Sequence, residues 1–258
     1  SSGFPARRLQ AAARLPEFEA LRDEARLIKD HVLEHLDIYL ERYETEVMAA
    51  GGQVHWCADA DAARAKIEEI CKAAGAKTVT KSKSMIGEEI AINRHLEAKD
   101  IKPVETDLGE YIIQLRNEPP SHIIAPAVHL TMDQVADTFI AHHEDLEPTR
   151  KLDEPRKLLE EARAQLRNKF IGADVGLTGA NMLIAETGSN VLVTNEGNAD
   201  LTYSLPKVHI VIASLEKIVP TLEDAATILR VLARSATGQE MSVYTTFCTG
   251  PRRETDTE

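Results

Sequence analysis

The sequence predicts an α/β fold in which a mostly parallel sheet is covered on both faces by helices. Between residues 59 and 142, short apolar runs alternate with longer stretches of helical spacing, a rhythm that is typical of βαβ units. Residues 176–214 contain short runs rich in Leu and β-branched side chains, bounded by turn residues, and these predict buried strands. With 258 residues, of which 43% are hydrophobic, the chain can bury the core of one large α/β domain or two small ones.

The first 52 residues are predicted to form a helical extension in front of this domain. From Pro16 to Ala50, apolar side chains recur at helical spacing, and nothing breaks the pattern before Gly51 and Gly52. The pattern predicts one long amphipathic helix, or two joined end to end. Because it exceeds the ~8–20 residues usual for globular helices, we expect it to project from the body or to pack along it.

The α/β domain is predicted to span residues 53–250. Gly75 favours a helix end, while Asp107 and Thr131 each stand at capping-box spacing from Glu110 and Gln134. Helices are predicted over residues 59–74, 84–98, 107–115, 131–142, 155–170 and 221–236. Strands are predicted over residues 53–57, 77–80, 102–105, 122–126, 182–185, 191–193, 208–213 and 242–246. Residues 251–258 are expected to be a disordered tail.

Charge and composition exclude several classes of partner. Asp and Glu (42) outnumber Lys and Arg (30), and the net charge is −12, which argues against a broad nucleic-acid-binding surface. No apolar run reaches the ~20 residues of a membrane helix, and no signal peptide is visible. We therefore expect a cytoplasmic protein without an integral membrane segment. Dinucleotide, P-loop and hydrolase-elbow motifs are also absent from the sequence.

The cysteines and histidines predict no metal site. Cys57, Cys71 and Cys248 are far apart and lack zinc or iron–sulfur spacing, and a sparse, odd number is typical of a reducing compartment. His142 and His143 end a predicted helix. We expect both to be solvated or to face the C-terminal end of the helix dipole.

A basic loop is the first candidate ligand site. Lys81, Lys83 and Ser84 follow a predicted strand and open a predicted helix. Ligands bind at the carboxyl ends of strands in open α/β sheets, and helix N-termini attract anions, so we predict a site for a small anion. Glu88, one turn into the helix, could pair with either lysine. The alternative is a solvated loop in which Ser84 is only an N-cap.

Three glycine-containing corners, at residues 176–179, 186–188 and 195–198, form the second candidate site. Glu186 follows an apolar run and precedes Thr187 and Gly188. Because burying an unpaired carboxylate is costly, Glu186 is predicted to be a nucleophile, base or ligand anchor, or equally a carboxylate that caps backbone N–H groups or pairs with arginine. We expect these corners and the lysine loop to line one hollow. The other predicted ligand contacts are Thr178, Gly179, Asn195, Glu196, Gly197 and Asn198.

These segments, in this order, resemble the lactate-utilisation (LUD) domain family. The resemblance depends on residues 81–88, 176–188 and 194–198 and covers most of the chain. It implies a three-layer α/β/α fold similar to the CoA-transferase and sugar-phosphate-isomerase superfamily. It also implies a part in the cytoplasmic oxidation of L-lactate to pyruvate, with other lactate-utilisation subunits as partners and electron transfer through 4Fe-4S clusters.

Iron–sulfur members of this family continue into a ferredoxin-like region with closely spaced cysteines, and residues 251–258 could begin such a region. A 4Fe-4S cluster needs about four thiolates. The three scattered cysteines of this sequence cannot supply them. We therefore expect no cluster within these 258 residues.

Three functions are compatible with these observations. The first is the LUD domain of the iron–sulfur subunit in an L-lactate-oxidising oxidoreductase complex, acting as a docking and ligand-binding module in electron transfer. The second is a stand-alone acyl- or CoA-transferase-like enzyme that uses Glu186, because a glutamate at a sharp turn is the nucleophile of CoA transferases. The third is a structural module that forms homo-oligomers through its long N-terminal helix.

Overall fold

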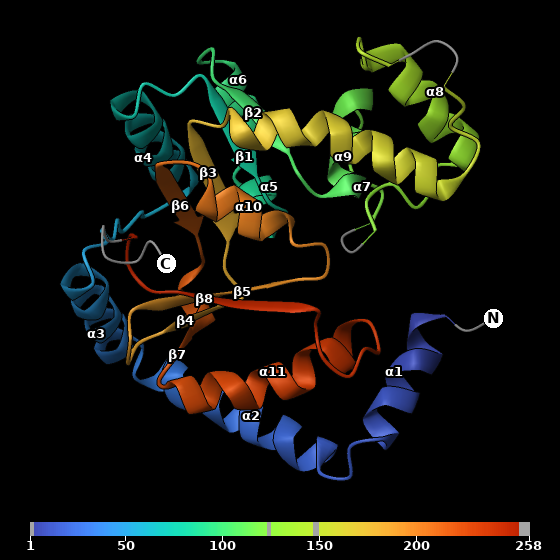
Figure 1. Ribbon diagram of the computed structural model, residues 1–258. Helices are drawn as coiled ribbons and strands as arrows, with labels where there is room; N and C mark the ends of the chain where they lie inside the picture. Colours follow the sequence, from blue (N-terminus) through green and yellow to red (C-terminus); the bar gives the residue numbers. More distant parts are fainter. Residues whose placement is uncertain (1–2, 123–124, 147–149, 253–258) are drawn as a thin grey trace. The chain divides into compact units, whose positions relative to one another are not determined.

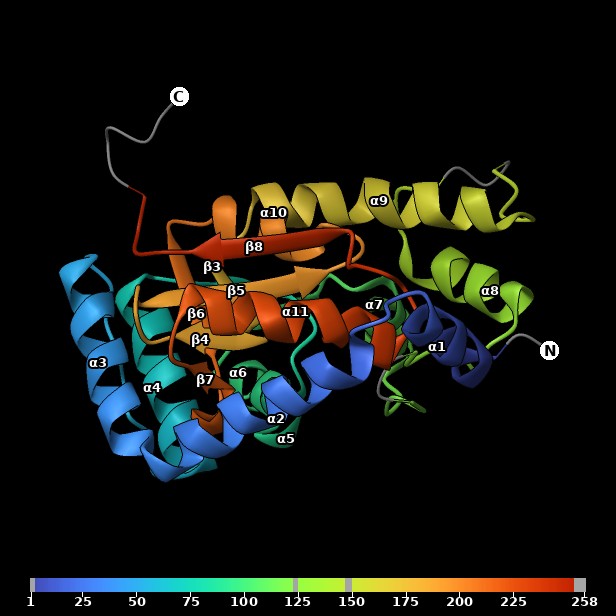
Figure 2. The ribbon, with the colours of Figure 1, turned by 90° about the horizontal axis from the view of Figure 1, so that it is seen from below.

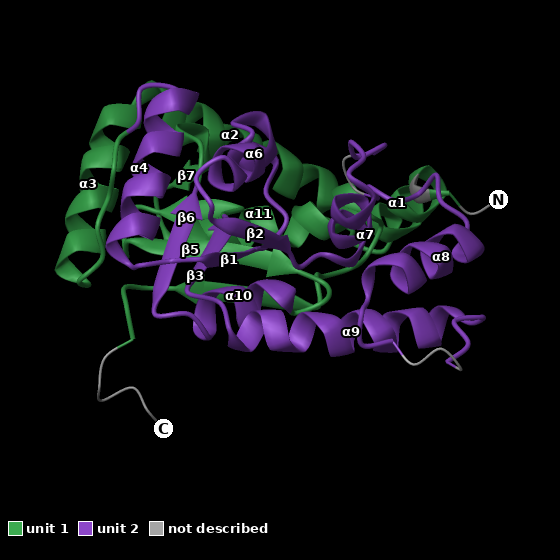
Figure 3. Cartoon of the chain, turned by 90° about the horizontal axis from the view of Figure 1, so that it is seen from above, with its two compact units in different colours: residues 1–56, 180–197, 213–258 green, residues 57–179, 198–212 purple. Residues whose placement is uncertain are grey.

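The computed structural model describes residues 3–122, 125–146 and 150–252, and Figures 1 and 2 show its helices and strands. The chain separates into two compact units, each assembled from segments that are distant in sequence (Figure 3). Unit 1 takes in residues 1–56, 180–197 and 213–258, and unit 2 takes in residues 57–179 and 198–212. The division predicted at residues 52 and 250 stays a prediction. Among the described helices, none is at once long enough and apolar enough to cross a membrane.

Unit 2 is built on sheet A, whose four parallel strands stand in the order β2-β1-β3-β6. β1 (Thr78–Lys81) pairs with β2 (Lys102–Glu105) on one side and with β3 (Val175–Gly179) on the other. β6 (Val208–Ile212) completes the sheet beside β3. The predicted α/β fold with a mostly parallel sheet is confirmed. Because β2 and β3 lie on opposite sides of β1, the strand order reverses at β1.

Helices cover both faces of sheet A, as predicted. On one face, α4, α5 and α6 pack around Val79 and Leu177. Neighbouring residues of a strand point to opposite faces, and on the other face Gly176 meets the backbone of Thr202 in α10. The helices of unit 2 are α4 (Ala60–Ala73), α5 (Met85–Glu89), α6 (Ile92–Glu97), α7 (Leu108–Arg116), α8 (Met132–His142), α9 (Pro155–Ile171) and α10 (Asn198–Ser204).

A second core joins α7, α8 and α9 to the edge strand β2. Phe139 is fully buried there and packs in the same cluster as Val104. Gln114 of α7 takes the place of a neighbouring strand: its Oε1 accepts the N–H of Glu105 over 3.0 Å, and its Nε2 donates to the carbonyl of Pro103 over 2.9 Å. An exposed edge strand can pair with strands of other chains. The side-chain amide of Gln114 occupies one N–H and one C=O group of β2 that would otherwise be available for such pairing.

The helix signals of unit 2 are mostly confirmed. Asp107 accepts hydrogen bonds from the first turn of α7, and Thr131 forms a capping box at the start of α8. Ser84 caps α5. The single helix predicted over residues 84–98 is wrong, because Ala91 takes a left-handed conformation (φ 51°) and separates α5 from α6.

Unit 1 is built on sheet B, whose strands stand in the order β7-β4-β5-β8. β5 is antiparallel to both β4 and β8, while β4 and β7 are parallel, so this smaller sheet is mixed. The elements of unit 1 are α1 (Phe4–Ala13), α2 (Phe18–Glu34), α3 (Leu36–Ala49), β4 (Met182–Ile184), β5 (Ser189–Thr194), the 3₁₀ helix η1 (Leu215–Lys217), β7 (Ile218–Val219), α11 (Leu222–Ala236) and β8 (Tyr244–Cys248).

The N-terminal helices contribute to the core of unit 1. α2 lies beside α11 (Figure 2), and Phe18 and Leu21 pack with Val231. In α3, Tyr43 is buried in a cluster that includes Leu183 of β4. The apolar faces of these helices are therefore used inside the unit, and a homo-oligomer formed through them stays a prediction.

The long N-terminal pattern forms two helices joined end to end, the second of the two predicted alternatives, because the backbone of His35 (φ −126°, ψ 33°) leaves the helical conformation. Other sequence-based assignments need correction. Residues 53–57 belong to no strand. Gly176 to Gly179, predicted as a corner, forms β3; the glycine at 176 serves close packing rather than a turn. The strand predicted over 122–126 lies partly outside the described residues, and residues 253–258 of the predicted tail lie entirely outside them.

Candidate functional site

Polar side chains gather at the carboxyl ends of the strands of sheet A. Lys81 is the last residue of β1, Glu105 of β2 and Gly179 of β3. Beside β1 the strand order reverses, and in open α/β sheets the ligand-binding crevice forms outside the carboxyl ends at such a switch point. The topology therefore favours the edge at which the sequence predicted a ligand.

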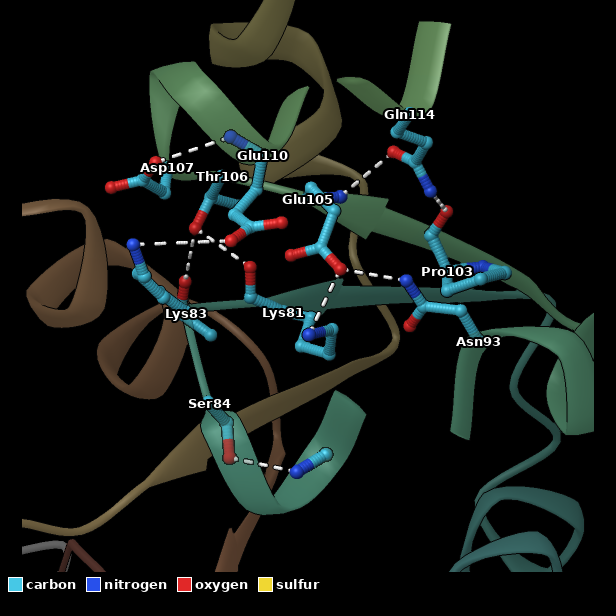
Figure 4. Close-up of polar contacts among 12 residues, drawn as sticks. Lys81, Lys83, Ser84, Asn93, Pro103, Glu105, Thr106, Asp107, Glu110 and Gln114 are labelled. Atoms are coloured by element: carbon cyan, nitrogen blue, oxygen red, sulfur yellow. Dashed lines mark hydrogen bonds and ion pairs between the residues drawn. The ribbon is translucent and has the colours of Figure 1, made fainter. Parts of the chain in front are cut away.

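Lys81 is held by a buried ion pair at this edge (Figure 4). Its Nζ lies 2.9 Å from Oε1 of Glu105, and the two side chains are 1% and 4% exposed. Asn93 donates from Nδ2 to the same oxygen over 2.6 Å. Burial raises the pKa of the Glu105 carboxyl, and the ammonium of Lys81 opposes that rise. The charge of Lys81 is thus balanced within the protein, so its role is to hold Glu105 in place.

The same pair leaves two acceptors open. Within the described part of the chain, Oε2 of Glu105 and Oδ1 of Asn93 are buried and receive no hydrogen bond from the protein. Leaving a buried acceptor unsatisfied costs about 1–3 kcal/mol. A water molecule or a small hydroxyl-bearing ligand has the donor that these oxygens lack.

Glu110 places beside Lys83 a carboxyl group whose pKa is close to neutral pH. Its Oε1 lies 3.9 Å from Nζ of Lys83, and the two side chains are 7% and 25% exposed. Burial, and then the negative charges of Glu88 and Glu105, raise the pKa of Glu110 to about 7, while Lys83 opposes the rise. Near neutral pH the carboxyl is therefore only partly ionised.

Replacing Glu110 with glutamine is expected to change how stability depends on pH. The pKa of about 7 lies above the ordinary 4.5, so the group contributes stability that is fully present below pH 4.5 and is lost as the pH rises to about 7. At about 1.4 kcal/mol per pKa unit, the loss is on the order of 3 kcal/mol. Urea unfolding between these pH values should show the difference between Glu110→Gln and wild type changing by this amount. A difference that stays constant across the window would contradict the assignment.

Hydroxyl and amide groups connect the strand ends to the helices that follow. Ser84 accepts an N–H from the first turn of α5 over 3.1 Å. Thr106 donates to the carbonyl of Lys81 over 2.9 Å, and Asn198 donates to Thr106 over 3.3 Å. A Cβ on Gly179 would lie 3.1 Å from Oγ of Ser84. Glycine at this position therefore lets the loop after β1 lie against the end of β3.

Seven of the predicted site residues belong to unit 2. Thr178 is fully buried and hydrogen-bonds through Oγ1 to Nε2 of His209 over 2.7 Å. Burial lowers the pKa of His209 to about 4, so this contact joins neutral groups within the sheet. The others lie at or next to the carboxyl edge. The seven are Lys81, Lys83, Ser84, Glu88, Thr178, Gly179 and Asn198.

The other six predicted residues belong to unit 1. Glu186 is exposed in the turn between β4 and β5, and its Oε2 accepts the N–H of Leu222 over 3.0 Å at the start of α11. This is the backbone-capping role that the sequence allowed beside a catalytic one. The prediction that the Glu186 corner and the lysine loop share one hollow stays a prediction. The six are Glu186, Thr187, Gly188, Asn195, Glu196 and Gly197.

Three of the remaining corner residues of unit 1 have structural roles. Gly188 has φ +65°, and a Cβ there would lie 2.5 Å from the backbone nitrogen of Val47, so only glycine fits. Asn195 accepts the N–H of Val243 over 3.2 Å, and Thr187 hydrogen-bonds Ser189 over 2.7 Å. These contacts fix the ends of β5.

Replacing Glu186 with alanine is expected to lower the free energy of unfolding by about 1 kcal/mol, the usual effect of losing a capping acceptor. Glu186→Gln keeps a side-chain oxygen for the N–H of Leu222 and should have a smaller effect. Urea unfolding of both variants measures the difference. A loss equal for both variants would show that the charge, rather than the hydrogen bond, stabilises α11.

One buried polar cluster was not predicted. His143, expected to be solvated or to face the C-terminal end of the helix dipole, is the C-cap residue of α8 and is 5% exposed. Its Nδ1 lies 2.9 Å from Oε1 of Glu161, whose side chain is 2% exposed. The solvated alternative is wrong, because Glu161 of α9 lies against the ring. A signal existed in the sequence: Glu161 stands on the same helical face as Leu158, Ala162 and Leu166, and a carboxylate on an apolar stripe requires a buried partner.

The described cysteines do not fit an iron–sulfur cluster. Cys57 is exposed and Cys71 is fully buried, and burial raises the pKa of Cys71 to about 11. A thiol held protonated is a poor metal ligand. Within residues 3–122, 125–146 and 150–252, no group of three or more His, Cys, Asp or Glu side chains is arranged to hold a metal ion.

Comparison with known proteins identifies the family. The sequence model of the LUD domain matches residues 40–258. The chain belongs to the LUD-domain family. The match confirms the resemblance drawn from the lysine loop and the glycine corners, and it begins within the N-terminal helices.

Several relatives of the chain share one name. "Lactate utilization protein B" of Shouchella clausii is 45% identical over 249 residues, which make up 96% of this chain and 52% of that protein. Proteins of the same name from Bacillus velezensis and Bacillus subtilis are 45% and 44% identical over similar lengths. The chain thus spans about half the length of the curated relatives it matches. A solved DUF162 family protein from Deinococcus radiodurans is 19% identical, with a TM-score of 0.26 over 72% of this chain and 88% of that one.

Proposed function

We propose that the chain is the LUD module of a protein that takes part in oxidising L-lactate to pyruvate, and that the carboxyl edge of sheet A binds the small 2-hydroxy or 2-oxo acid. The observation that carries the proposal is 45% identity across 96% of the chain to a protein named for lactate utilisation. The geometry of the edge supports it. Lys83 places an ammonium group 3.9 Å from Oε1 of Glu110, and the topology favours a crevice at the same place.

The chemistry of L-lactate suits the groups at this edge. Its oxidation to pyruvate releases two electrons and two protons. In the proposed arrangement Lys83 attracts the substrate carboxylate, and the ionised form of Glu110 accepts the hydroxyl proton. A base is most effective when its pKa lies near the working pH, and the pKa of Glu110 is about 7. The second proton, from C2, is released to solvent, and the two electrons pass to an electron acceptor.

The electron acceptor is assigned by chemical class only. We propose 4Fe-4S clusters of the lactate-utilisation system, and other subunits of that system as partners. The cysteines of the described residues do not fit such a cluster, so no step of electron transfer is assigned to them. The module would act as a docking and ligand-binding part of an oxidoreductase complex.

The proposal is tested by L-lactate consumption in cells whose own copy of the gene carries Lys83→Met or Glu110→Gln. A general base contributes about 10²–10⁴-fold to a rate, so Glu110→Gln should slow consumption by at least about 100-fold. Glu186→Gln, which alters a carboxylate of unit 1, is the matched control and should consume L-lactate at the wild-type rate. Normal consumption in both Lys83→Met and Glu110→Gln would overturn the proposed site.

The same comparison addresses the alternative of an acyl- or CoA-transferase-like enzyme. That hypothesis requires Glu186 as nucleophile or base. The contact between Glu186 and the N–H of Leu222 is what a helix cap makes, and no observation of the described residues favours a catalytic role over it. Loss of activity in Glu186→Gln, with Glu110→Gln active, would favour the alternative.

A further inference from the structure

A polar pocket lies in unit 2, away from the carboxyl edge of sheet A. Its volume is about 270 Å³, and it is lined by residues of β2, α7, α8 and α9. Pockets for drug-sized ligands begin at roughly 300 Å³, so this one suits a smaller molecule. Lys102 and Lys169 line it together with Tyr111 and His143.

The two lysines carry positive charge that the protein does not neutralise. Burial and then the charge of Lys102 lower the pKa of Lys169, so the two ammonium groups repel each other across the pocket. Among the described residues, no carboxylate lies within 4.0 Å of either ammonium, although Glu97 also lines the pocket. In a chain with net charge −12, two adjacent cations without an acidic partner favour a bound anion.

Tyr111 and His143, which line the pocket floor, belong to a hydrogen-bonded chain that leaves the charge of the two lysines intact. Glu161 accepts from Nδ1 of His143 over 2.9 Å, and Nε2 of His143 therefore accepts from the hydroxyl of Tyr111 over 3.0 Å. Burial lowers the pKa of His143, which keeps the ring neutral. Arg150, 2.9 Å from the second oxygen of Glu161, balances its charge, and Gln165 donates to its first oxygen over 3.1 Å. Glu161 thus repels an anion in the pocket only weakly.

We propose that this pocket is a binding site for a small anion with several oxygens, held by Lys102 and Lys169 over the Tyr111–His143 floor. The ligand class includes inorganic phosphate and short dicarboxylates, because both present several negatively charged oxygens to two ammonium groups. The proposal is independent of the lactate site. It uses neither Lys83 nor Glu110, and it would stand if those residues had no part in lactate oxidation.

Titration of the purified 258-residue chain with inorganic phosphate and with malonate tests the proposal. Calorimetry should show saturable one-site binding of at least one of the two anions. The double variant Lys102→Met/Lys169→Met should weaken it by at least about tenfold, equivalent to about 1.4 kcal/mol. Lys207→Met, which removes an exposed lysine of the same unit outside the pocket, is the matched control and should bind as wild type does. Stronger binding of phosphate or of malonate would show which kind of anion the pocket prefers.

NMR spectroscopy identifies the position of the bound anion independently of calorimetry. The ring resonances of His143 should move during the titration with the same affinity as the heat signal, because His143 lines the pocket. The proposal is overturned if both anions bind more weakly than about 10 mM, or if the double variant binds as tightly as Lys207→Met. Saturable shifts that leave His143 unmoved would also overturn it. Circular dichroism of the variants confirms that each remains folded.

Discussion

Replacing Lys81 with methionine is expected to lower the free energy of unfolding by about 3–5 kcal/mol, the usual effect of removing one partner of a buried ion pair. The side chains of Lys81 and Glu105 are 1% and 4% exposed. In the variant, solvent therefore cannot reach the Glu105 carboxylate to take the place of the lost ammonium group. Asn93 alone would then donate to this carboxylate. Urea unfolding monitored by circular dichroism measures the effect.

A double variant separates the loss of the pair from a general loss of packing. Lys81→Met combined with Glu105→Leu removes both charges, and buried pairs replaced by apolar residues are often tolerated. The double variant should therefore be more stable than Lys81→Met alone. Lys207→Met, at an exposed position, should stay within about 0.5 kcal/mol of wild type. If Lys81→Met cost less than about 1 kcal/mol, the pair would not be the buried contact described above.

Replacing Gly176 with alanine is expected to cost at least about 3 kcal/mol, at the upper end of the range for overpacking. A Cβ at this position would lie 1.8 Å from the carbonyl oxygen of Thr202, and a backbone atom cannot move aside as a flexible side chain can. α10 would have to lift from sheet A. Thermal and urea unfolding of Gly176→Ala measure the loss, and Gly176→Val should be worse.

Gly87 provides the matched control for that substitution. It lies in α5, and a Cβ there would meet Ser84 at 3.4 Å, an ordinary contact distance. Alanine also has a higher helix propensity than glycine by about 1 kcal/mol. Gly87→Ala should thus be neutral or slightly stabilising. Equal losses in Gly87→Ala and Gly176→Ala would show that sensitivity to alanine does not come from the contact with Thr202.

The parallel sheet of unit 2 was predictable because its signals are local. Short apolar runs alternate with capped amphipathic helices, and Asp107 and Thr131 mark helix starts that the structure confirms. Sheet B was harder to anticipate. It combines the two-residue strand β7 with β8 and a hairpin, and strands that short have no periodicity of their own. Gly176 was predicted to be a turn residue, because the sequence alone does not distinguish a glycine needed for close packing from one needed for a turn.

The position of the lysine loop in the fold was predictable, but its electrostatics were not. The loop follows β1 and lies at the carboxyl edge of sheet A, as the sequence indicated. That Lys81 is neutralised by Glu105 depends on the register between β1 and β2, which residue spacing does not fix. The raised pKa of Glu110 depends on burial and on two carboxylates from other elements. Such long-range effects arise only when the chain is folded.

The central claim is that the carboxyl edge of sheet A binds a small 2-oxo or 2-hydroxy acid, and titration of the ¹⁵N-labelled chain with pyruvate tests it most directly. We expect saturable shifts of the backbone amides of Lys83, Ser84 and Gly179, which Lys83→Met weakens at least about tenfold and Lys207→Met leaves unchanged. If those three amides do not move while pyruvate binds elsewhere, or if pyruvate does not bind at all, the site assigned here to lactate chemistry is wrong.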